Sequence, residues 1–123
     1  NIQRVQVPKK AEGIRTALQA GDLLFSITGE VGMLGLIPDK FETAYINQHT
    51  ATLRFLPALR NKYIPYFLLT EHAKKCYKGN QHGIKNSFRL DAICDILVPI
   101  PSSQEQKKIV DRIEELFNKI TLI

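Results

Sequence analysis

A cluster of cations and amides in the second half of the chain holds the side chains best suited to chemistry. Between positions 74 and 89 the sequence has no Asp or Glu, and its cations are Lys74, Lys75, Lys78, Lys85 and Arg89. Interleaved with them are the polar side chains of Asn80, Gln81, His82 and Asn86. Cations of this kind contact phosphates, and amides offer donors and acceptors to base edges. The pattern points to nucleic-acid contact; the alternative is the solvated end of a helix and its loop.

Patterns that mark common catalytic sites do not occur in the sequence. Gly29, Gly32 and Gly35 lack the Lys-Ser/Thr of a phosphate loop and the spacing of a dinucleotide fingerprint, so we expect them to serve turns or a bulge. No serine stands in a Gly-x-Ser-x-Gly elbow, and no Cys-x-x-Cys or paired histidine suggests zinc. We therefore expect a chain that binds rather than catalyses, with no metal and no cofactor of its own.

Composition is that of one small globular domain with a basic surface. The chain has 123 residues, 44% of them hydrophobic, and a formal net charge of +5, which favours a polyanionic partner. It has no apolar run long enough to cross a membrane and no signal-peptide pattern at its start. Cys76 and Cys94 are expected to be thiols in a reducing cytosol, so a cytoplasmic location is predicted.

Hydrophobic patterning predicts the elements that must position the polar cluster. Strands are expected at 23–27, 33–37, 44–46, 50–55 and 96–100, helices at 64–77 and from about 103, a helical turn at 90–94, and a loop at 80–87. The prediction is an α+β fold: a small twisted β-sheet domain with packed helices over 1–101, then a long coiled-coil-type helix that starts in 102–123.

The C-terminal helix is the clearest of these elements. Pro101 ends the extended run, and Ser102 with Glu105 forms a potential capping box. Apolar residues then recur at spacings of four and three, at Ile109, Ile113, Leu116, Ile120 and Ile123. Glu115 and Lys119 add a charge pair one turn apart. Because this seam is still running at the last residue, we expect a partner helix, and a chain that is a piece of a longer protein or one half of an assembly.

The order of several short motifs resembles the DNA-specificity subunit of type I restriction–modification systems. The matching segments are Gly21-Asp22-Leu-Leu-Phe-Ser-Ile-Thr-Gly29, Gly32 to Pro38, Ile46-Asn47-Gln48, Tyr63 to Leu69, and Pro99 to Leu116. They cover about residues 15–120 and look like the later part of one target recognition domain with the start of the conserved spacer helix. The loop at 79–90 matches the family only in character.

That resemblance implies a recognition and scaffold protein rather than an enzyme. Such a subunit reads one half of a two-part site in double-stranded DNA and docks methyltransferase subunits, which bind S-adenosylmethionine and methylate adenine. A restriction subunit joins the complex for cleavage. The spacer helices set the distance between half-sites.

Under this interpretation the polar loop supplies the DNA contacts. Asn80, Gln81, His82 and Asn86 are the candidate base readers, and Lys78, Lys85 and Arg89 are the candidate phosphate contacts. Two other interpretations stay open. One is a protein-interaction module that self-associates through its C-terminal helix, and the other is a remnant of a fused restriction–methylation enzyme.

Overall fold

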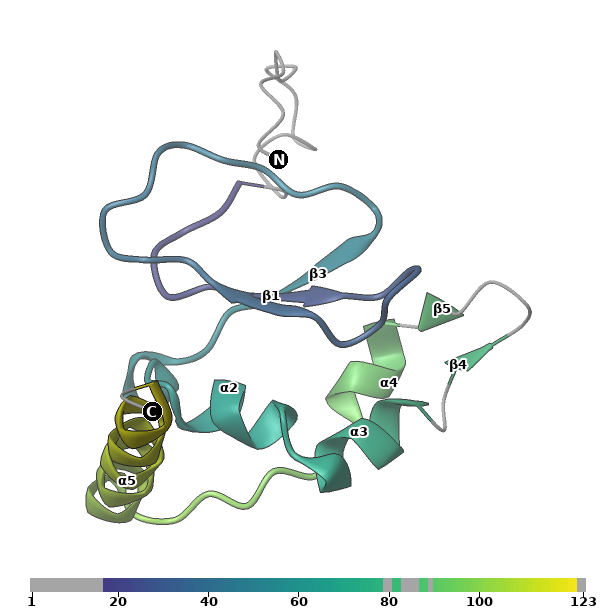
Figure 1. Cartoon of the computed structure of the whole chain (residues 1–123). Coiled ribbons are helices and arrows are strands. Elements are labelled where there is room, and N and C mark those ends of the chain that lie inside the picture. The colour runs from purple at the N-terminus through teal and green to yellow at the C-terminus, as the bar shows by residue number, and fades with distance from the viewer. Residues whose placement is uncertain (1–16, 79–80, 83–86, 89, 122–123) are drawn as a thin grey trace.

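A computed structural model describes residues 17–78, 81–82, 87–88 and 90–121 of the chain. Its centre is a three-stranded antiparallel sheet of order β2-β1-β3, formed by β1 (Leu23–Ser26), β2 (Leu34–Leu36) and β3 (Thr50–Leu53). Helices cover one face of the sheet, and the connection from β2 to β3 loops out on the other side (Figure 1). The expected α+β class is confirmed.

Alternation along β1 and β3 builds the sheet side of the core. Leu23 and Phe25 of β1 are buried, and in register Phe25 lies opposite Ala51 of β3. Leu53 and Phe55, which follow Ala51 at every second position, pack against the same cluster. The half-buried strand predicted at 50–55 is therefore confirmed in its pattern, although the strand itself ends at Leu53.

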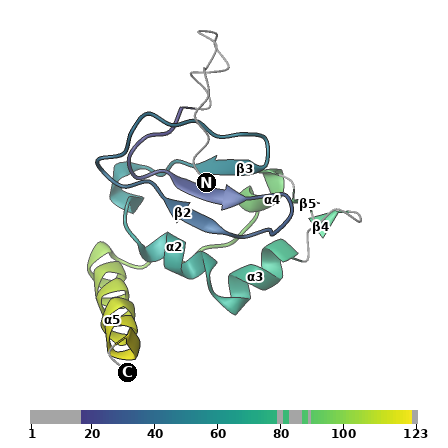
Figure 2. The ribbon, with the colours of Figure 1, turned by 45° about the horizontal axis from the view of Figure 1, so that its top comes forward.

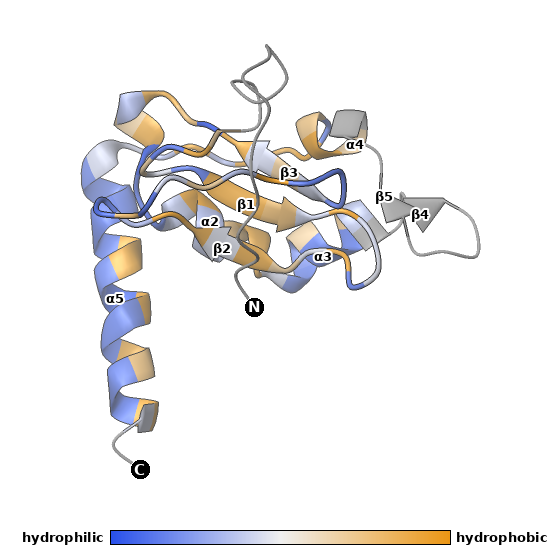
Figure 3. Cartoon of the chain, turned by 90° about the horizontal axis from the view of Figure 1, so that it is seen from above, coloured by the Kyte–Doolittle hydropathy of each residue, from blue (hydrophilic) through white to orange (hydrophobic). Residues whose placement is uncertain are grey.

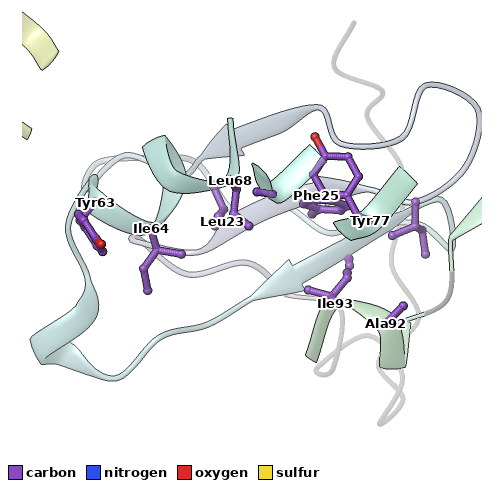
Figure 4. Close-up of a cluster of buried hydrophobic side chains, with 11 residues drawn as sticks. Leu23, Phe25, Tyr63, Ile64, Leu68, Tyr77, Ala92 and Ile93 are labelled. Atoms are coloured by element: carbon purple, nitrogen blue, oxygen red, sulfur yellow. The ribbon is translucent and has the colours of Figure 1, made fainter. Parts of the chain in front are cut away.

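The helical side of the core comes from three short helices beneath the sheet. They are α2 (Tyr63–Leu68), α3 (Glu71–Lys78) and α4 (Leu90–Cys94), and a 3-10 turn at Pro57–Leu59 precedes them. Figure 4 shows their buried side chains facing Leu23 and Phe25. Phe25 and Tyr77 make an edge-on aromatic contact in this cluster, with their ring centroids 5.2 Å apart.

One expected helix, 64–77, is two. Thr70 separates α2 from α3: its hydroxyl donates to the Phe67 carbonyl at 2.7 Å and accepts from the Ala73 N–H at 3.3 Å. A threonine in this position caps a new helix, and the chain restarts as α3 in a new direction. Leu68 of α2 and Ala73 and Tyr77 of α3 are buried in the core.

Two other expected elements are wrong. Residues 96–100 form neither strand nor helix, because Pro99 and Pro101 have no N–H to donate to a ladder and the Pro99 carbonyl instead accepts from the Tyr63 hydroxyl at 2.7 Å. In place of a strand at 44–46 there is a single bridge between Tyr45 and Ala17.

The segment expected to be a loop, 80–87, contains structure. β4 (Gln81–His82) pairs antiparallel with β5 (Ser87–Phe88) as a short hairpin. Cys76 and Cys94 are thiols, as expected.

The C-terminal helix, α5 (Ser103–Thr121), begins where predicted and leaves the compact part of the molecule (Figure 2). Ser102 caps it by accepting from the Glu105 N–H at 3.2 Å, whereas the Glu105 carboxylate lies 3.5 Å from Lys108 Nζ. Lys119 pairs with Glu115 at 3.2 Å, as predicted. Within the described residues, no helix has the length and apolar character needed to cross a bilayer.

Candidate nucleic-acid interface and the C-terminal helix

The short hairpin of β4 and β5 lies in the sequence between two helices of the core. It connects α3 to α4, and Ala73 and Tyr77 of α3 and Ala92 and Ile93 of α4 are all buried. Burial also raises the pKa of the Tyr77 hydroxyl, as expected for a phenol surrounded by apolar side chains. The two helices that flank the hairpin in the sequence are therefore packed into the core.

The structure places part of the predicted DNA-contact set in this hairpin. Lys78 is the last residue of α3, and Gln81 and His82 form β4, opposite Phe88 and Ser87. The remaining members lie outside the described residues: Asn80, Lys85, Asn86 and Arg89. Their assignment as base readers or phosphate contacts stays a prediction.

The helix that leads into the hairpin is basic at its end. Lys74, Lys75 and Lys78 are three of the last five residues of α3, against a single Glu71 in its first turn. Lys74 Nζ lies 3.6 Å from Glu71 Oε1, a solvent-exposed pair of the kind that contributes little to stability. The approach to the hairpin is thus positively charged, which suits a polyanion.

At the other end of the molecule, α5 has apolar residues on two neighbouring faces of the helix. The first contacts the domain: Val110 packs against the core cluster, and the Phe117 ring lies 6.1 Å from that of Tyr66 in α2. The second is the predicted seam, of which Ile109 is 39% exposed, Leu116 44% and Ile120 65%. Figure 3 shows hydrophobic residues recurring along the length of the helix. Ile113 is half-buried, and Ile123 lies outside the described residues.

A polar junction between α2 and α5 was missed by the sequence analysis. Asn61 Nδ2 donates to Gln106 Oε1 at 2.9 Å, and Lys62 Nζ lies 2.7 Å from Glu114 Oε1. The ammonium of Lys62 lowers the pKa of Glu114, and burial followed by the Glu114 charge raises the pKa of Tyr66. A signal was available, since Gln106, Val110, Ile113 and Phe117 follow one another at spacings of four, three and four.

An ion pair between a buried carboxylate and a partly exposed arginine, next to the start of β1, was also missed. Asp22 is 1% exposed, and its carboxylate accepts from Arg54 Nε at 2.8 Å and from Arg54 Nη2 at 2.7 Å. The Gln19 N–H adds a third bond at 2.7 Å. Hydrogen bonding from Arg54 is the main reason that the pKa of Asp22 is lowered. The pair ties β1 to the end of β3, so Asp22 has a structural role rather than a DNA-contacting one.

Carboxylate, histidine and cysteine side chains do not converge into a metal-binding group in the part of the chain that the structure describes. Two surface features could engage a macromolecular partner: the basic residues that lead into the hairpin and the exposed stripe of α5. The first suits phosphates and base edges, and the second suits an apolar helix.

Comparison with known proteins gives one family. The family model described as "Type I restriction modification DNA specificity domain" matches residues 11–123. The chain is 26% identical over 108 residues to the Type I restriction enzyme EcoBI specificity subunit of Escherichia coli. That alignment covers 84% of this chain and 22% of the relative, so the chain spans about a fifth of the length of the relative it matches.

Proposed function

Because this chain belongs to the type I restriction–modification DNA specificity domain family, we propose that it reads one half of a two-part DNA site and docks the methyltransferase subunits that modify it. The family match over residues 11–123 is the observation that carries this proposal. Membership gives DNA sequence specificity as the role of the domain. Half-site reading and the identity of the docked subunits are the finer parts of the proposal.

The arrangement of the molecule supports a division between reading and docking. The β4–β5 hairpin and α5 lie at opposite ends of the core in all three ribbon views (Figures 1, 2 and 3). A basic helix leads into the hairpin, and an apolar stripe runs along α5. A DNA-reading tip and a scaffold helix can therefore engage different partners at the same time.

In this proposal, the partner subunits carry out methyl transfer and DNA cleavage. The methyltransferase subunit would bind S-adenosylmethionine and transfer its methyl group to adenine, and a restriction subunit would join the complex for cleavage. The role proposed for this chain is to position the partners: the hairpin selects the DNA, and α5 holds the partner subunits in a set place relative to that DNA.

Self-association is the second candidate function, and the exposure of Ile109, Leu116 and Ile120 favours it. A helix with an unpaired apolar seam can bury that seam against a second copy of itself. This alternative would leave the basic hairpin region without a role.

Capture of partners from the native host tests the proposal. The tagged chain is used as bait, and the co-purifying proteins are identified by mass spectrometry. We expect a methyltransferase that carries Asn-Pro-Pro-Phe/Tyr, and we expect Leu116→Asp to lose it while the exposed neighbour Asn118→Asp retains it. Recovery of the bait with itself alone, abolished by Leu116→Asp, would replace the proposal with self-association.

A further inference from the structure

A buried amide lies where the C-terminal helix joins the domain. Gln106, in the first turns of α5, is 3% exposed, and it is the one buried residue of that helix among those described. A buried amide is stable only when its donors and acceptor are used. The partners of Gln106 therefore show what the junction requires.

The hydrogen bonds of Gln106 form a relay with a defined direction. The Tyr63 N–H donates to Asn61 Oδ1 at 2.8 Å, Asn61 Nδ2 donates to Gln106 Oε1 at 2.9 Å, and Gln106 Nε2 donates to the Pro101 carbonyl at 2.9 Å. The first group can only donate and the last can only accept, so both amides are fixed in one orientation. The relay joins the start of α2 to the residues that enter α5.

The other side-chain contacts that α5 makes with α2 are more exposed. The Lys62–Glu114 pair is largely open to solvent, with side chains 55% and 37% exposed, and such pairs contribute little. The Phe117 ring that meets Tyr66 is itself 52% exposed.

The connection at 96–102 is itself tied to the domain, because the Tyr63 hydroxyl donates to the Pro99 carbonyl at 2.7 Å and Val98 packs against the core. These contacts end before Pro101, so the relay through Gln106 is the buried hydrogen-bonded link that reaches into α5 itself.

We propose that Gln106 is a positioning residue whose amide, held between Asn61 and Pro101, fixes the direction in which α5 leaves the domain. Loss of the relay leaves α5 helical and attached through Val110, but free to swing about the connection. The orientation of α5 relative to the β4–β5 hairpin then becomes variable. If α5 carries the spacer between two DNA half-sites, a variable orientation of α5 would make the distance between those half-sites variable. This effect on DNA spacing rests on the proposed function, whereas the fixed direction of the helix does not.

Pulsed electron paramagnetic resonance can test whether the direction of α5 is fixed, because it measures the distribution of distances between a spin label on α5 and one on the domain. Spin labels are placed at the exposed positions Asp39→Cys and Asn118→Cys, with Cys76 and Cys94 replaced by alanine. We expect one narrow distance distribution for the parent chain and a clearly broader one for Gln106→Met, which fills the same space without hydrogen bonds. Gln104→Met, at an exposed position of the same helical turn, serves as the control and stays narrow.

Two outcomes would overturn the assignment. A narrow distribution for Gln106→Met, with the parent mean, would show that packing rather than the relay orients the helix. If Gln106→Met fails to fold, Asn61→Ala removes the exposed middle link of the relay and leaves Gln106 in place. Unchanged width in that variant would count equally against the relay, and broadening would support it.

Adenine methylation in the host tests the functional consequence. Sequencing of modified adenines in the native strain gives the spacer length between the two halves of the target. We expect Gln106→Met to add methylated sites whose spacer differs by a base pair and to lower the preference for the original spacer several-fold. Methylation confined to the original spacer, at the original level, would overturn the link to spacing. Absence of targeted methylation in the parent strain would instead contradict the proposed function, and the spin-label result would still decide the role of Gln106.

Discussion

Asp22 is a buried carboxylate whose charge is balanced by Arg54. The guanidinium bonds it through two nitrogens, and the Gln19 N–H bonds it as well. Replacing it with asparagine removes the charge and puts an N–H₂ group in a place arranged for an acceptor. We expect Asp22→Asn to lower the free energy of unfolding by about 1–3 kcal/mol at neutral pH, measured by urea denaturation.

The same residue predicts how stability depends on pH. Because Arg54 lowers the pKa of Asp22 in the folded chain, the stabilisation is present above the unfolded pKa of about 3.9 and is lost as the pH falls through the folded value. The difference between the parent and Asp22→Asn should therefore shrink below about pH 4. Asp39→Asn, at an exposed carboxylate, is the matched control. An equal loss from Asp39→Asn, or a difference that persists unchanged into acid, would contradict the role given to the ion pair.

The turn between β1 and β2 is built against a side chain of α3. Gly32 has a φ of +91°, and a Cβ at this position would lie 2.6 Å from Tyr77 Oη. Gly29 has a similar φ of +76°, but a Cβ there meets nothing within 4 Å. A side chain at Gly29 would meet backbone strain alone, whereas a side chain at Gly32 would meet the same strain and a clash with Tyr77.

The contrast between Gly29 and Gly32 gives a paired prediction for the turn between β1 and β2. Gly29→Ala should cost about 1 kcal/mol of stability, from backbone strain alone. Gly32→Ala should cost about 2–4 kcal/mol, because Tyr77 must also move away from its edge-on contact with Phe25. Denaturation midpoints of the two variants provide the comparison. Equal midpoints would mean that Tyr77 does not buttress the turn.

Elements with a strong local signal were predictable, and those determined by distant partners were not. The alternation from Ala51 to Phe55 and the cap at Ser102 followed from neighbours in sequence. The split at Thr70 depended on a side chain that could serve either a helix interior or a cap. The run at 96–100 has strand-forming residues, but Pro99 has no N–H to donate to a neighbouring strand, and its carbonyl accepts from the Tyr63 hydroxyl instead.

The same limit applies to the functional surfaces. Heptad spacing identified the stripe that α5 leaves exposed, but the stripe that contacts α2 includes a glutamine and was overlooked. Asn61 and Gln106 are 45 residues apart, so no local pattern connects them. The sequence pattern identified the predicted DNA-contact residues by their type, and the structure adds the β4–β5 pairing and the burial of the helices on either side of it.

Considered as one body, the molecule keeps the two regions proposed to bind DNA and partner subunits apart. The compact core lies between the hairpin and α5, and the side chains that bond or stack on α5 from the start of α2, Asn61, Lys62 and Tyr66, belong to neither α3 nor α4. Energetic effects of substitutions at well-separated sites without shared partners usually add. DNA contact and partner docking should therefore be separable by mutation.

Lys85→Ala and Leu116→Asp test this separation in opposite directions. Lys85→Ala removes a predicted phosphate contact, so in the assembled complex we expect weaker binding to all sequences and a slope of log affinity against log salt that falls by about one. Partner capture should be unaffected. Leu116→Asp should lose the partner, yet leave the free energy of unfolding within about 0.5 kcal/mol, because Leu116 is 44% exposed. If Lys85→Ala also released the partner, the hairpin and α5 would have to act as one interface, and the opposite-end arrangement could not explain the division of function.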